Sequence, residues 1–178
     1  MAYSIDTSHS LIEFSVKHMM VSTAKGRFTK FQGAVEIDEA NPANSKVSVT
    51  IDTASVTTGD EKRDGHLRSA DFFNAEQYPT ATFTSTKVEA LGGENYRVTG
   101  DLTLHGVTHP VTFDFTREGV TKNMQGSSLQ GFSAAFTISR KDFGLEWNVA
   151  LETGGFMVSD QVKITLEVEA VEAASAAA

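Results

Sequence analysis

Histidines close to other histidines or to carboxylates are the groups in this sequence that could hold a metal ion. His105 and His109 are separated by three residues, a spacing that places two imidazoles on one face of a helix. Gly106, Thr108 and Pro110 surround them, and these residue types favour a β-turn, in which the two rings diverge. We therefore predict no metal site at this pair.

Acid–base catalysis is the second kind of chemistry to weigh. His66 lies near Asp64 and Asp71, and a histidine beside a carboxylate can transfer protons, but such residues in a charged segment are more often solvated or capping. His9 and His18 have no carboxylate at ligand spacing. The chain has no GxSxG, Walker or dinucleotide-binding motif and no cysteine, which excludes thiolate chemistry. We predict a protein without catalytic activity and without a cofactor.

The overall charge excludes further classes of partner. The formal net charge is −8 and no basic run is present, so non-specific nucleic-acid binding and attraction to an anionic membrane are not expected. No stretch approaches the roughly 18 apolar residues of a membrane span. The opening residues lack the basic and apolar regions of a signal peptide, which indicates a cytoplasmic protein, or a periplasmic one if a leader has been removed.

Apolar and polar residues alternate along most of the chain, which is typical of antiparallel strands with one dry face. The alternating runs lie at residues 12–18, 31–37, 47–51, 96–104, 111–115, 132–138 and 162–168, and a further strand contains Phe83. Asn41-Pro42 and Gly92-Gly93 are turn signals between runs. Strands with one dry face must close into a barrel or pair into a sandwich.

The charged segment 60–74 breaks this alternation. Asp60 is suited to cap a short helix, and Ser69 to cap a second turn ending near Asn74. We expect one or two short helices in this connection, lying across the barrel.

Four motifs, taken together and in order, resemble the YceI family of lipid-binding proteins. They read YSIDTSHSLIEFSVKHMMVSTAKGRFTKFQG, DEKRDGHLRSADFFNAEQYPTATF, GDLTLHGVTHPVTF and FTISRKDFGLEWN, and the resemblance runs from Tyr3 to about Ala170. It implies an all-β fold, an extended lipocalin-like antiparallel β-barrel of about eight strands with a helix beside it. It also implies a single domain over 1–172 and is compatible with a homodimer. The small, featureless residues 173–178 predict a frayed tail.

The inward positions of such a barrel could pack together or line a ligand cavity. The resemblance favours a cavity, because apolar walls with few polar groups are what ligand pockets need. Small residues at Gly33, Gly100, Ala134 and Ala135 would keep space along the axis or ease the curvature of the barrel. The predicted wall consists of Phe14, Val16, Phe31, Val35, Val49, Ile51, Phe83, Leu102, Phe113, Phe115, Phe132, Phe136 and Ile138.

Arg68, His105, Arg140 and Asp142 are the candidates for contact with a polar head group. An arginine offers a planar fork of donors to phosphate oxygens. The alternative is structural: Arg68 could pair with Asp64 or Asp71, and Arg140 with Asp142. We favour the structural interpretation for each one taken singly.

The function predicted from the sequence is binding of a long-chain amphiphilic lipid in an elongated apolar interior. A polyisoprenoid, an isoprenoid quinone, a polyprenyl phosphate and a fatty lipid all fit this description. The purpose would be carriage, storage or sensing of the lipid. Two alternatives stay open: a small enzyme acting on a lipid-like substrate, and a protein-interaction module with a filled barrel.

Overall fold

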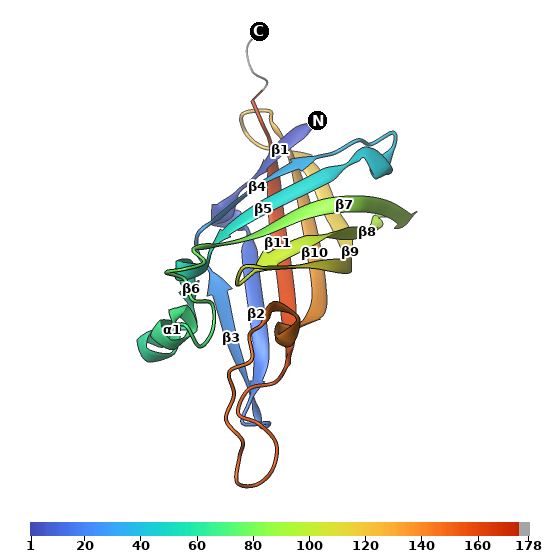
Figure 1. Ribbon diagram of the computed structural model, residues 1–178. Helices are drawn as coiled ribbons and strands as arrows, with labels where there is room; N and C mark the ends of the chain where they lie inside the picture. Colours follow the sequence, from blue (N-terminus) through green and yellow to red (C-terminus); the bar gives the residue numbers. More distant parts are fainter. Residues whose placement is uncertain (175–178) are drawn as a thin grey trace.

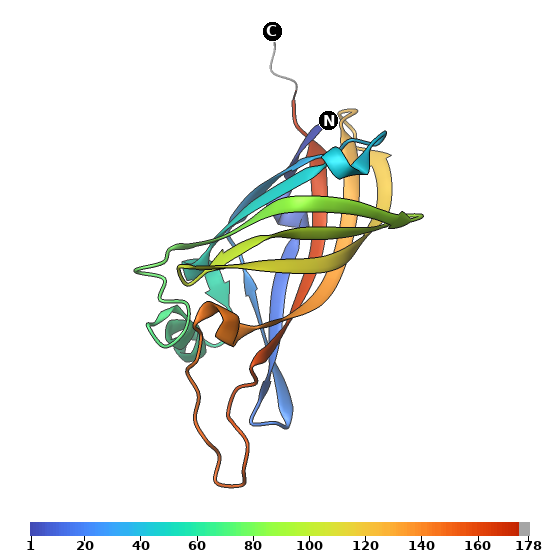
Figure 2. The ribbon, with the colours of Figure 1, turned by 45° about the vertical axis from the view of Figure 1, so that its right-hand side comes forward.

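A computed structural model describes residues 1–174, which form an antiparallel β-barrel with one α-helix at its end (Figures 1 and 2). The alternating apolar residues predicted this architecture, because each strand must bury one face. The strands are β1 (Ala2–Ile5), β2 (Leu11–His18), β3 (Ser22–Phe28), β4 (Phe31–Glu36), β5 (Lys46–Asp52), β6 (Val56–Thr57), β7 (Thr80–Gly92), β8 (Asn95–Leu104), β9 (Val107–Lys122), β10 (Ser128–Ser139) and β11 (Gln161–Glu172).

The eleven strands occupy eight positions in a closed ring. Five positions hold one continuous strand each, and three are each divided between two successive strands. β1 and β2 both pair with β11, on either side of the short 3-10 helix η1 (Thr7–His9). In the same way β3 continues into β4, and β5 continues into β6 across η3 (Thr53–Ser55). The ring closes because β1 also pairs with β4.

The strand register sends one set of side chains into the barrel. On β10, Phe132 and Phe136 lie opposite Val168 and Ile164 of β11 and face inward, whereas Thr137 is exposed on the outside. This period-two arrangement is the one that the sequence predicts, so the predicted inward positions share one interior.

The charged connection forms one helix, α1 (Glu61–Arg68), at the end of the barrel away from the chain termini (Figures 1 and 2). The predicted cap is confirmed: the Asp60 side chain accepts a hydrogen bond from the Arg63 backbone N–H at 3.1 Å. The expectation of one or two short helices is met by this single helix, and residues 69–74 form turns in which the Asn74 N–H donates to the Ser69 carbonyl. The Thr58 N–H and hydroxyl donate to Asp64 at 2.7 and 2.6 Å and hold the helix against the barrel.

A small cluster of buried apolar residues in contact with one another lies near α1. It consists of Ala81, Leu104, Phe143 and Leu145. Phe143 belongs to the 3-10 helix η4 (Arg140–Phe143), which follows β10. Only ten apolar residues of the described part are buried, in a chain of 178 residues, so much of its apolar sequence lies elsewhere.

The end of the chain is paired as far as Ala173, whose N–H donates to the Ala2 carbonyl at 2.8 Å. The predicted frayed tail is therefore held at its first residue, and residues 175–178 lie outside the described part. Within residues 1–174, no helix is long and apolar enough to cross a membrane.

Candidate functional site

A cavity of about 660 Å3 occupies the interior of the barrel. Its volume lies within the range of about 300–1,000 Å3 that is usual for ligand pockets. All thirteen apolar residues predicted for the wall, from Phe14 to Ile138, line it. The structure thus brings the predicted wall together, and its contact with a ligand stays a prediction.

The wall side chains retain accessible surface inside the barrel. All thirteen are half-buried, whereas core residues such as Phe143 and Val98 are 0% and 2% exposed. Inward side chains that filled the barrel would be buried to the same extent as that core. The interior is therefore hollow along much of its length.

Phenylalanine rings form the middle of the cavity wall. Phe83 lies 5.7 Å from Phe113, and Phe113 stacks on Phe136 at 4.2 Å, between ring centroids. Phe115 lies 5.9 Å from Phe132. Rings in contact with one another present a stiff apolar surface that few polar atoms interrupt.

Further rings line the end of the cavity near α1. Phe72 and Trp147 both pack against His66, with centroid distances of 5.0 and 4.7 Å. The His66 Nε2 atom lies 2.9 Å from a carboxylate oxygen of Asp71. The acid–base pair weighed from the sequence therefore exists with Asp71, whereas Asp64 is engaged by Thr58 instead.

Arg140 is a structural residue at this end. Its side chain is only 4% exposed, and it donates to the backbone carbonyls of Ser159, Leu145 and Trp147 at 2.9, 2.7 and 2.9 Å. Burial lowers the pKa of its guanidinium, and the charge of Asp160 opposes that shift. Asp160, not the predicted Asp142, is its nearest acidic partner, at 3.7 Å. These hydrogen bonds tie the segment that follows η4 to the barrel. Arg140 also lines the cavity, so its contact with a head group stays a prediction.

The other predicted head-group residues lie outside the cavity wall. Arg68 is exposed at the end of α1, and Asp142 is exposed in η4. His105 lies in the turn between β8 and β9 with a φ of 55°, where its ring packs edge-on against Tyr78. The His109 ring packs against Phe143, with centroids 5.8 Å apart. Neither Arg68 nor His105 lines the cavity, so the cavity wall gives their contact with a head group no support, and that contact stays a prediction.

At the opposite end of the cavity, Arg117 is a second arginine whose donors are used within the protein. It forms ion pairs with Glu39 at 2.8 Å and with Glu94. The hydrogen bond to Glu94, followed by those to Glu39, raises the pKa of Arg117, while desolvation opposes the rise. This arginine links the connection after β4 to the start of β8.

A buried polar pair lies near the same end, and the sequence analysis missed it. The Gln130 Nε2 donates to the Tyr3 hydroxyl at 3.0 Å, and that hydroxyl donates to Ser128 Oγ at 3.3 Å. Gln130 lines the cavity and is 3% exposed, and Tyr3, which pairs with the inward residue Val35, is 4% exposed. A signal was present in the sequence: Gln130 lies at an even spacing from Phe132 and Phe136 on the same strand, so its side chain points to the same face.

The small residues do not keep space in the way that the sequence suggested. A Cβ on Gly100 would lie 2.5 Å from the Phe83 ring and 2.6 Å from the Thr84 carbonyl oxygen, and one on Gly33 would meet Ile5 at 2.5 Å. These glycines allow neighbouring groups to pack closely against the strand backbone. Ala134 does line the cavity.

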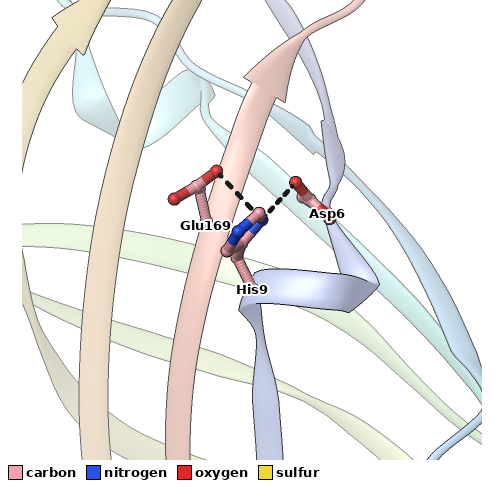
Figure 3. Close-up of side chains that lie close together, drawn as sticks. All are labelled: Asp6, His9 and Glu169. Carbon is pink, nitrogen blue, oxygen red and sulfur yellow. Dashed lines mark hydrogen bonds and ion pairs between the residues drawn. The ribbon is translucent and has the colours of Figure 1, made fainter. Parts of the chain in front are cut away.

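A cluster on the outer surface joins His9 to two carboxylates (Figure 3). His9 Nδ1 lies 2.9 Å from Asp6 and 3.8 Å from Glu169 of β11. The sequence analysis was wrong to find no carboxylate near His9, because Glu169 is distant in sequence and the turn brings Asp6 round to the ring. Hydrogen bonds from Ser8 and His9 lower the pKa of Asp6 to about 2. The cluster fastens η1 to the barrel wall and lies outside the cavity.

Comparison with known proteins agrees with this geometry. The model of the YceI-like domain matches residues 3–170. UPF0312 protein SA2479 of Staphylococcus aureus (strain N315) is 42% identical over 168 residues, which cover 94% of this chain and 95% of that protein. UPF0312 protein SAS2572 of S. aureus (strain MSSA476) is 40% identical over the same shares.

Solved structures share the barrel. BcnA of Burkholderia cenocepacia superimposes with a TM-score of 0.78 at 31% identity, over 93% of this chain and 98% of that one. The YCEI protein of Campylobacter jejuni gives 0.75 at 36%, over 89% and 90%. A polyisoprenoid binding domain from Saccharophagus degradans gives 0.73 at 21%, over 96% and 98%, which is a likeness of fold. The chain belongs to the YceI-like domain family.

Proposed function

We propose that this protein binds a long-chain amphiphilic lipid of the polyisoprenoid type inside its barrel, and that it carries, stores or senses that lipid without transforming it. The observation that carries the proposal is the hollow interior, whose thirteen apolar wall residues are all only half-buried. Support from the fold comes from the polyisoprenoid binding domain of S. degradans, which has the same barrel.

Such binding is driven by the removal of apolar surface from water, both on the lipid and on the cavity wall. Each Å2 of apolar surface that is buried contributes about 25 cal/mol, and each methylene about 0.8 kcal/mol. Ordering a flexible chain opposes this gain. Aromatic rings such as Phe113 and Phe136 form few directional interactions with a ligand. We therefore expect the binding affinity to depend on the length and branching of the lipid chain.

A small enzyme acting on a lipid-like substrate is the alternative that one observation favours. His66 lines the cavity and contacts Asp71, as a general base would. Its ring also packs against Phe72 and Trp147, which contact each other, and this suits a wall residue equally well. His66→Phe separates the two functions: a wall residue tolerates the change with lipid binding retained, whereas a base loses all turnover.

The test of the proposal is a thermal-shift series on delipidated protein with isoprenoid alcohols of increasing length. A ligand that binds only the folded state raises the melting temperature by mass action. The rise is expected to grow with chain length until the cavity is full, and then to level off. If no member of the series shifts the melting temperature, the barrel does not bind isoprenoids.

A further inference from the structure

Two segments that are distant in sequence form one projection beyond α1, at the end of the barrel away from the chain termini (Figures 1 and 2). They are the β2–β3 turn and the loop between η4 and β11. The Met19 N–H donates to the Met157 carbonyl at 2.7 Å and joins them. We call these segments, residues 18–22 and 148–158, the tip.

The tip exposes apolar side chains. Val21 is 86% exposed and Met20 is 65% exposed, and Met19, Val149 and Phe156 are exposed as well. These five are half of the ten large apolar side chains that are exposed in the described part of the chain. Single exposed apolar residues are ordinary, but a group of them on one feature marks a surface that binds a protein or a membrane.

Three lysines lie on the outer face of the barrel next to the tip. Ser15 of β2 pairs with Lys25 of β3 on one side and with Lys163 of β11 on the other, so the two lysines flank it in one row. Lys17 lies two residues along β2 from Ser15 and therefore on the same face. All three lysines are exposed, and within residues 1–174 the ion pairs of lysines are formed elsewhere.

The local charge differs from that of the whole chain. The net charge of −8 predicts no attraction to an anionic membrane, but residues 14–35 contain four lysines and arginines and no acid. Glu152 is the one acidic residue of the tip, and the neighbouring Asp160 is engaged by Lys141 at 3.4 Å. Charges more than about 10 Å apart at the surface are largely screened, so acids at the far end of the barrel do not cancel this field.

The cavity reaches the surface at this same end. His18, Lys62 and Arg63 are exposed and also line the cavity, as do Met157 and Val158 of the tip. An opening for a long apolar ligand therefore lies beside the exposed apolar residues. This arrangement favours a bilayer over a protein as the partner, since a bilayer is also a source of such ligands.

The spacing between the apolar residues and the lysines fits a bilayer surface. A strand rises about 3.3 Å per residue, so Lys17 lies roughly 10 Å from Met20 along the hairpin. Apolar side chains of interfacial segments enter about 5–10 Å into the boundary between head groups and acyl chains. With the tip at that depth, the lysines would be level with the lipid phosphates.

We propose that the tip docks on an anionic lipid bilayer, with its apolar side chains in the interface and the three lysines against lipid phosphates. The opening beside α1 then faces the membrane, and a lipid passes between bilayer and barrel with little exposure to water. Docking stands on the outer surface alone, whereas this passage rests on the proposed function.

The test is co-sedimentation of delipidated protein with vesicles of phosphatidylcholine, with and without phosphatidylglycerol. The native protein is expected to bind the anionic vesicles more tightly and to lose this preference at high salt. Lys25→Gln combined with Lys163→Gln should weaken that binding roughly 25-fold, or about fivefold for each lysine. Val21→Asp should weaken it by at least about tenfold, because an apolar side chain is replaced by a charged one.

Met124→Asp and Lys122→Gln are the matched controls, since both positions are exposed at the opposite end of the barrel and Met124 is 97% exposed. Both should bind the vesicles as the native protein does. Docking is overturned if native protein ignores the anionic vesicles, which would leave the tip to a protein partner. It is equally overturned if Met124→Asp loses as much binding as Val21→Asp.

Transfer of geranylgeraniol from anionic vesicles to the protein tests the passage. Val21→Asp should slow the transfer about tenfold and leave the affinity for geranylgeraniol unchanged, because Val21 does not line the cavity. Equal transfer rates in the native protein and Val21→Asp would overturn the passage. A native protein that binds the vesicles but takes up no geranylgeraniol would confirm docking and refute the proposed function.

Discussion

The rings of Phe113 and Phe136 stack face to face across neighbouring strands, with centroids 4.2 Å apart and planes inclined by 6°. Both line the cavity and both are half-buried. They come from β9 and β10, so the stack fixes the cavity wall where these two strands diverge. We expect a lipid chain bound in the barrel to lie against this pair.

Phe136→Asp is expected to abolish lipid retention while the barrel still folds. The substitution places a carboxylate in an apolar wall, where an unpaired charge is strongly disfavoured. Thr137→Asp is the matched control, because Thr137 is the next residue of β10 and is exposed on the outer face. Binding of geranylgeraniol by both variants checks the expectation. Retained binding in a folded Phe136→Asp variant would show that the wall is assigned to the wrong residues.

Arg140→Ala is expected to lower the free energy of unfolding by about 3 kcal/mol, because three backbone carbonyls lose a charged donor inside the protein. Urea denaturation measures the loss. At equal fractions of folded protein, lipids with charged and neutral heads should be affected alike. A stable variant that loses only the charged lipids would instead make Arg140 a head-group residue.

Gly100→Ala is expected to destabilise the barrel by about 1–3 kcal/mol, since the new methyl group would meet the Thr84 carbonyl oxygen at 2.6 Å. Gly119→Ala is the control on β9, where an added Cβ has nothing within 4 Å. It should change stability by less than about 0.5 kcal/mol. The melting temperatures of the two variants measure this difference in stability. Equal values would mean that the strands around Gly100 can move apart.

The barrel was largely predictable from sequence because period-two alternation is a direct consequence of closing a sheet around an interior. The interruptions were not, since η1 and η3 depend on local capping: Asp6 accepts from the Ser8 N–H, and Asp52 from the Ala54 N–H. The sequence left open whether the connection holds one helix or two, and the structure has one: the Ser69 hydroxyl donates to the His66 carbonyl where α1 ends.

The polar part of the site was far less predictable. In a sequence, an arginine that binds a ligand looks the same as one that holds a loop in place. The structural role of Arg140 is visible only from the backbone carbonyls that accept its hydrogen bonds. Gln130 looked like one polar residue among many, although its phase along β10 placed it among inward phenylalanines. Glu169 is close to His9 only because β11 lies beside the first strand of the ring.

His9 is expected to titrate above its ordinary pKa of 6.5, first because of Asp6 and then because of Glu169. The raised pKa of His9 means that its stabilising charge is present at low pH and is lost as the pH rises through the raised value. The lowered pKa of Asp6, about 2, means that its contribution is lost only as the pH falls below its ordinary 3.8. The pair therefore stabilises most between about pH 4 and about pH 6.5.

NMR titration of the His9 ring measures this shift. Asp6→Asn should return the pKa of His9 most of the way to its ordinary value, and Glu169→Gln by a smaller step. An unchanged pKa in Asp6→Asn would mean that the contact in Figure 3 does not persist in solution.

Native mass spectrometry of protein purified from its own source, before and after solvent extraction, tests lipid binding most directly. The account predicts a discrete long-chain species that leaves on extraction, with its mass matching an isoprenoid, and a lower melting temperature for the emptied protein. A protein that is empty from the start, equally stable after extraction and unable to take up added isoprenoid alcohols would contradict it.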